Sequence, residues 1–121
     1  MQAIHLTLLF AGLCALMQCW LTALVIARRV QSGINLMDGG DAVLVRRIRA
    51  HANFAETVPM ALLLMLLLEL GGLAATWLWL LGLALVAGRL LHVCGLLMEG
   101  MAWSRLGGMV LTLGVLSMEA V

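Results

Sequence analysis

The sequence alternates between long apolar segments and short polar or glycine-rich breaks. Each apolar segment is long enough for a helix that crosses a bilayer, which needs about 20 residues. The breaks contain glycine, asparagine, aspartate and serine, the residues that favour turns and loops. We therefore predict that residues 1–121 form a single all-α membrane domain, a bundle of four transmembrane helices over about 3–27, 41–70, 74–98 and 102–121.

The second predicted helix is longer than a membrane span requires. It begins at Asp41, a residue suited to an N-cap, and ends before Gly71. About 30 residues at 1.5 Å each give about 45 Å, whereas the hydrocarbon core is about 30 Å thick. Since the excess lies at the arginine-rich start, we expect that end to project into the lipid headgroups.

Composition supports a membrane location. Hydrophobic residues make up 64% of the chain and charged residues 11%, and the mean hydropathy is +1.13. A soluble domain carries roughly twice that charge. The first apolar run is too long for a signal peptide and lacks a basic start, so we expect it to remain as a span. The net charge of +1 indicates no nucleic-acid partner.

The arginines predict an orientation. They gather around the first connection and flank the third, whereas the turn at Gly71-Gly72 has none. These residues are Arg28, Arg29, Arg46, Arg47, Arg49 and Arg105. The positive-inside rule then places the first and third connections in the cytoplasm and both termini outside.

A polar stripe interrupts the second apolar segment. Its members are Arg46, Arg49, Asn53 and Glu56, at offsets of 0, 3, 7 and 10. At about 100° per residue these side chains fall within roughly 80° of the helix circumference. Charged groups at mid-helix cost about 2.5–3.5 kcal/mol each, so they face a partner or a water-filled cavity. A ligand site for a zwitterion, an internal Arg49–Glu56 network and a headgroup anchor are the three interpretations.

The third predicted helix repeats this template with Arg89, His92, Leu96 and Glu99. A buried arginine needs an anion, for which Glu56 or a ligand carboxylate is the candidate. His92 is either a structural hydrogen-bonding group or a catalytic one. In the second helix, Pro59 marks either a packing kink or a bend that opens a pocket.

Other reactive residue types form no recognisable site. His5 lies far from the polar stripe and has no assigned role. The three cysteines, Cys14, Cys19 and Cys94, have no metal-ligand spacing and are interpreted as packing residues. We predict no metal site, because the histidines and Glu56 do not form a recognised ligand set.

The second-helix pattern resembles the signature of a known family. It reads Arg46-x-x-Arg49-Ala50-His51-x-Asn53-x-x-Glu56-x-x-Pro59 and is similar to that of the membrane-associated proteins in eicosanoid and glutathione metabolism, the MAPEG family. The resemblance implies a homotrimer with glutathione sites between subunits on the cytosolic side. Bacterial members have this size, which implies an inner-membrane protein that binds glutathione as cosubstrate.

The resemblance also assigns roles to residues. Arg49, Asn53 and Glu56 correspond to glutathione ligands, and His51 to a polar residue that touches the tripeptide. Arg28 corresponds to an arginine that binds a glutathione carboxylate, and Arg29 to one that assists the electrophile. Arg105 is the nearest candidate for the cation that stabilises the thiolate. The predicted catalytic residues are Arg105, Arg29 and His92, and the predicted binding residues are Arg28, Arg46, Arg49, His51, Asn53, Glu56, Thr57 and Arg89.

The chain departs from the family pattern in its lack of tyrosine. Thr57 stands where the eicosanoid enzymes have a tyrosine, and His92 and Leu96 replace two more on the third helix. His92 can serve as a hydrogen-bond donor to a thiol, whereas Leu96 cannot. The leading hypothesis is a glutathione transferase or peroxidase for hydrophobic electrophiles, and the alternative is a lipid- or partner-binding protein without catalysis. A small exporter is disfavoured, because residues 3–27 contain no acidic side chain.

Overall fold

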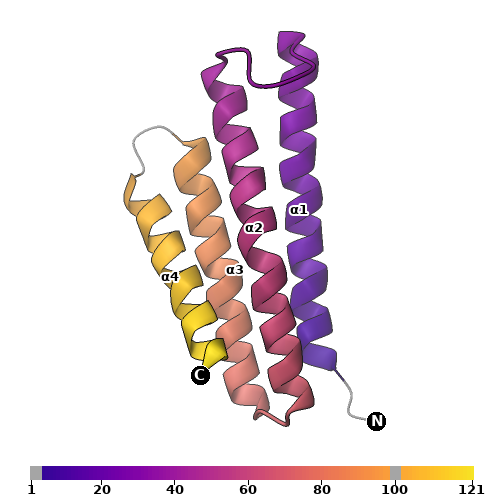
Figure 1. Cartoon of the computed structure of the whole chain (residues 1–121), viewed down its shortest axis with the longest axis vertical. Coiled ribbons are helices and arrows are strands. Elements are labelled where there is room, and N and C mark those ends of the chain that lie inside the picture. The colour runs from indigo at the N-terminus through magenta and orange to yellow at the C-terminus, as the bar shows by residue number, and fades with distance from the viewer. Residues whose placement is uncertain (1–3, 99–101) are drawn as a thin grey trace.

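The computed structural model describes residues 4–98 and 102–121. Within them, four antiparallel helices lie side by side as a bundle: α1 (His5–Ser32), α2 (Ala42–Leu70), α3 (Ala75–Leu97) and α4 (Ala102–Ala120) (Figure 1). The first three are long and apolar enough to cross a membrane. The predicted all-α membrane fold is thereby confirmed.

The helices are not equivalent in their packing. α3 packs against each of the other three, and α2 also packs against α1 and α4. In the part of the chain that the structure describes, α1 and α4 make no contact with each other. They flank the central α2–α3 pair on opposite sides (Figure 1), so α2 contacts a different neighbour on each of its two sides.

The end of α1 differs from the prediction. The helix continues to Ser32, about a turn beyond Arg28 and Arg29. Gly33 then adopts the left-handed conformation, with φ of 71°, and its N–H bonds to the carbonyl of Arg29. Arg28 and Arg29 therefore lie within the last turns of α1 and do not end the helix. This position is favourable, because the helix dipole stabilises a cation near the C-terminus.

The start of α2 agrees with the prediction. The Asp41 side chain accepts a hydrogen bond from the backbone N–H of Leu44 at 2.7 Å and caps the helix. α2 continues through Pro59 without ending. Figure 1 shows α1 and α2 extending past α3 and α4 at the end that carries the α1–α2 loop. The arginine-rich end of α2 therefore projects beyond α3 and α4, and its position among the lipid headgroups remains a prediction.

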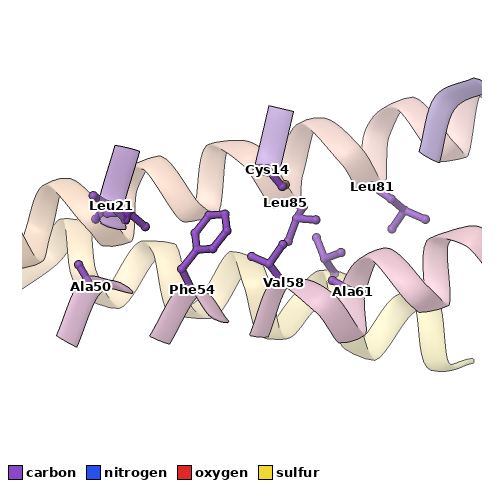
Figure 2. Packing of buried hydrophobic residues seen from close by; sticks show 10 residues of the cluster. Cys14, Leu21, Ala50, Phe54, Val58, Ala61, Leu81 and Leu85 are labelled. Carbon is purple, nitrogen blue, oxygen red and sulfur yellow. The ribbon is translucent and has the colours of Figure 1, made fainter. Parts of the chain in front are cut away.

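The interior of the bundle is apolar. Side chains from α1, α2 and α3 meet along the bundle axis, among them Leu21, Phe54 and Leu85 (Figure 2). Cys14 belongs to this core, as predicted for a packing residue. The same prediction is wrong for Cys19 and Cys94, which lie on exposed faces of α1 and α3.

Glycine permits the close approach of α3 and α4. A Cβ atom on Gly108 would lie 2.4 Å from the carbonyl oxygen of Gly88 and 2.5 Å from the backbone nitrogen of His92. Side chains larger than hydrogen therefore do not fit at this crossing. Gly107 and Gly114, which lie on the same helix, have no neighbouring atom within 4 Å of such a Cβ.

The first turn of α1 is capped by another helix. Ile4 precedes the helix and makes no side-chain cap. Instead, the Glu69 carboxylate in the last turn of α2 accepts hydrogen bonds from the backbone N–H groups of Leu6 at 2.9 Å and Thr7 at 2.8 Å. This contact connects the start of α1 to the end of α2.

Candidate functional site

A cavity of about 540 Å³ lies between α2, α3 and α4, near the arginine-rich end of the bundle. All four members of the predicted stripe line its α2 wall, as their spacing indicated. The lining residues are Val45, Arg46, Arg49, Ala52, Asn53, Glu56, His92, Leu96, Arg105, Leu106 and Met109. The volume falls within the range of about 300–1,000 Å³ that is typical of small-molecule sites.

The cavity combines charges of both signs. Arg46, Arg49 and Arg105 supply guanidinium groups from two helices, and Glu56 supplies a carboxylate. Arg49 and Glu56 do not pair with each other: among the described residues the ion pair is Arg28–Asp41. The internal Arg49–Glu56 network that the sequence allowed is therefore not formed. Both side chains are exposed and accessible to a molecule in the cavity.

Asn53 is held in one orientation by α3. The guanidinium Nη1 of Arg89 donates to Asn53 Oδ1 at 2.6 Å and to Thr57 Oγ1 at 3.1 Å. The hydroxyl of Thr57 in turn donates to the backbone carbonyl of Asn53 at 2.9 Å. The Asn53 amide nitrogen lies 3.8 Å from the sulfur of Met109, which lines the cavity. The amide therefore turns its N–H donors toward α4 and the cavity, while its oxygen faces Arg89.

Arg89 does not have the acidic partner that the sequence suggested. Its side chain is 1% exposed and contacts the neutral oxygens of Asn53 and Thr57 rather than Glu56. Its Nε and Nη2 atoms have no hydrogen-bond partner in the described part of the chain. Because Arg89 lies behind Asn53 and outside the cavity lining, we interpret it as a residue that positions the site. Its predicted role as a direct ligand remains a prediction.

His92 on α3 and Arg105 on α4 both belong to the lining of the cavity. His92 is buried, at 6% exposure, and Arg105 is exposed, yet both line the cavity. Leu96 lies one turn after His92 on the same wall. Glu99, the last member of the α3 template, lies outside the described residues.

The two arginines at the end of α1 bind to residues of the α1–α2 connection. Arg28 forms a forked ion pair with Asp41, through Nε at 3.0 Å and Nη2 at 2.6 Å. Hydrogen bonds from Arg28 and the capped backbone lower the pKa of Asp41 to about 2. Arg29 donates to the carbonyl oxygens of Ile34 and Met37, at 3.3 and 2.9 Å. Neither arginine lines the cavity of its own chain.

His51 and Pro59 face α1 rather than the cavity. His51 Nε2 lies 2.8 Å from Gln18 Nε2 and 3.0 Å from Thr22 Oγ1, so the histidine hydrogen-bonds the neighbouring helix. Pro59 lines an apolar groove between α1 and α2 and does not open the polar cavity. The binding role that the resemblance implied for His51 remains a prediction.

Sequence reasoning missed the apolar part of the cavity. Val45, Ala52, Leu106 and Met109 complete its lining. The α4 spacing carried a signal, because Met109 follows Arg105 by four residues and so lies on the same face. In the described part of the chain, no three histidine, cysteine or acidic side chains come together as metal ligands.

Comparison with known proteins agrees with this architecture. The model of the MAPEG family matches residues 7–121. The inner membrane protein YecN of Escherichia coli, from strain K12 and from strain O6:H1, is 38% identical over 100 residues, which cover 82% of this chain and 76% of YecN. The chain is an integral membrane protein that belongs to the MAPEG family.

Proposed function

We propose that this protein binds glutathione in the cavity between α2, α3 and α4 and joins it through its sulfur to a hydrophobic electrophile, or reduces a peroxide with two glutathione molecules that become the disulfide. The observation that carries the proposal is the placement of three guanidinium groups, one carboxylate and one oriented amide around one cavity of about 540 Å³. The family match makes glutathione the first candidate among zwitterionic ligands.

The chemistry of the cavity complements that of glutathione. Glutathione carries two carboxylates, an ammonium group and a thiol. Arg46 and Arg49 present guanidinium groups, which match carboxylates in charge and geometry. Glu56 presents the carboxylate that an ammonium group requires. Since Arg89 engages the oxygen of Asn53, the amide donates to the ligand through its N–H groups.

Arg105 and His92 are the groups that we assign to the reacting sulfur. A thiol with an ordinary pKa of about 8.5 becomes a better nucleophile when a cation stabilises its thiolate. Arg105 is the α4 guanidinium that lines the cavity, and His92 lines it from α3. In transfer, the thiol proton leaves to solvent. The sulfur lone pair then forms the bond to the electrophilic carbon, whose leaving group departs with its electron pair.

We further propose that the site is completed by neighbouring subunits in a homotrimer. Arg28 and Arg29 lie at the end of α1 and do not line the cavity of their own chain, so they reach a glutathione site only from a second copy. The arginines of both connections gather at one end of the bundle, and by the positive-inside rule this supports a cytoplasmic position of the cavity in an inner membrane. An apolar electrophile enters from the bilayer.

Titration of the detergent-solubilised protein with glutathione in a calorimeter tests binding. We expect Arg49→Ala to weaken binding at least tenfold, because it removes a charge-assisted contact worth about 1.5–3 kcal/mol. Arg47→Ala is the matched control, since Arg47 does not line this cavity. Absence of glutathione binding, or equal affinity in both variants, would exclude the proposal.

A second candidate function is ligand binding without catalysis. It is favoured by the absence of tyrosine from the whole chain and by Leu96 on the cavity wall, which offers no hydrogen bond to a thiol. This alternative predicts glutathione binding with no change in thiolate absorbance and no conjugate. Conjugation that disappears in Arg105→Ala or His92→Phe would exclude it.

A further inference from the structure

A second cavity, of about 200 Å³, lies at the arginine-rich end between α1, α2 and α3. Its lining combines cations with apolar side chains: Trp20, Leu24, Val43, Arg46, Arg47 and Leu97. It faces away from α4, since no α4 residue lines it. Apart from Arg46, it shares no residue with the polar cavity.

Arg47 is fixed at the junction of two helices. Its Nη1 donates to the backbone carbonyl of Leu24 in α1 at 2.8 Å. A guanidinium has several N–H donors in a rigid plane, so one anchored nitrogen fixes the direction of the others. Arg47 is half-buried, which excludes part of the water that screens a surface charge. The anchored group is therefore prepared to bind an anion.

The order of the lining residues matches the order of groups in a phospholipid. Arg46 and Arg47 lie just inside the start of α2, at the end that projects beyond α3 and α4 (Figure 1). Trp20 lies one turn further from the loop than Leu24, about 6 Å deeper along α1, and its ring is 46% exposed on the flank of the bundle. Tryptophan at this depth is typical of the boundary between headgroups and hydrocarbon.

The charge of the lining selects the headgroup. None of the six lining residues is acidic, whereas the glutathione cavity contains Glu56. Among the described residues that line this cavity, none offers a carboxylate to the ammonium group of a zwitterionic headgroup. We propose that this cavity binds an anionic phospholipid, with its phosphate diester on Arg47 and an acyl chain along Trp20 and Leu24.

Native mass spectrometry of the intact protein can test this proposal. The protein is purified in a neutral detergent and offered equal amounts of phosphatidylglycerol and phosphatidylcholine. We expect preferential retention of phosphatidylglycerol and at least a fivefold loss of that preference in Arg47→Gln. Arg49→Gln is the matched control, because it removes the same charge from the neighbouring face and lines only the other cavity.

Three outcomes of this experiment would contradict the lipid-binding proposal. Equal retention of the two lipids, or an unchanged preference in Arg47→Gln, would overturn it. Displacement of the lipid by millimolar inorganic phosphate would show a general anion site and would also overturn it. A thermal melt in phosphatidylcholine micelles identifies a misfolded variant, for which the uncharged Arg47→Met then replaces Arg47→Gln, with the same expected loss of preference. Glutathione titration of Arg47→Gln separates the two sites, since its affinity for glutathione is expected to stay unchanged.

Discussion

The crossing of α3 and α4 gives the sharpest test of the packing, because two adjacent glycines on α4 have opposite surroundings. A methyl group on Gly108 would lie 2.4 Å from the carbonyl oxygen of Gly88 and 2.7 Å from the Cβ of His92. Gly107 has no atom within 4 Å of the same added carbon. Gly108→Ala must therefore push the helices apart, while Gly107→Ala need not move anything.

The expected effect is the difference in the free energy of unfolding between Gly108→Ala and Gly107→Ala. Replacement of glycine by alanine in a helix stabilises it by about 0.5–1 kcal/mol, and this gain is common to both positions. Overpacking costs about 1–3 kcal/mol. At Gly108 two of the opposing atoms belong to the backbone and cannot rotate away, so we expect the upper part of that range. Gly108→Ala should be less stable than Gly107→Ala by about 2–3 kcal/mol.

Unfolding of the protein by sodium dodecyl sulfate in mixed micelles provides the assay. The fluorescence of the 4 tryptophans reports the transition. The same displacement would move Arg105 and Met109 relative to His92, so Gly108→Ala should also weaken glutathione binding. Equal unfolding midpoints for the two alanine variants would refute the close approach of α3 and α4.

Two further predictions concern the ends of the helices. Asp41 has its pKa lowered to about 2 by Arg28 and the helix cap, so its stabilisation is complete above its unfolded pKa of about 3.9 and is lost as the pH falls toward 2. Thermal melts from pH 6 to pH 2 should therefore show a steeper decline for the wild type than for Asp41→Asn, and parallel curves would contradict this. Glu69→Gln should destabilise the protein by about 0.5–2 kcal/mol, because an amide provides one acceptor for two N–H groups. Hydrogen exchange at Leu6 and Thr7 should accelerate in that variant, whereas in the control Glu56→Gln it should not change.

The sequence was most informative where one helix determines the outcome by itself. The spacing of Arg46, Arg49, Asn53 and Glu56 placed them on one face, and the structure gives them one cavity. The apolar segments and the Asp41 cap likewise follow from local chemistry. In each case the deciding contacts are made within a turn or two of the same helix.

The sequence was least informative where the outcome depends on which helix lies opposite. Within the chain, His51 hydrogen-bonds Gln18 and Thr22 of α1, a contact that its spacing did not indicate. Arg89 was expected to meet Glu56 or a ligand carboxylate, and within the chain it contacts the neutral oxygens of Asn53 and Thr57 instead of Glu56. The spacing of residues along a helix predicts which side chains share a face, but it does not predict which helix packs against that face.

The Glu69 cap has a consequence for the order in which the chain is assembled. The carboxylate that caps α1 is synthesised 62 residues after Thr7, whose N–H it accepts. Until α2 is made, this cap cannot form. The smallest unit in which the Glu69 carboxylate and the N–H groups of Leu6 and Thr7 satisfy each other is the helical hairpin of residues 5–70.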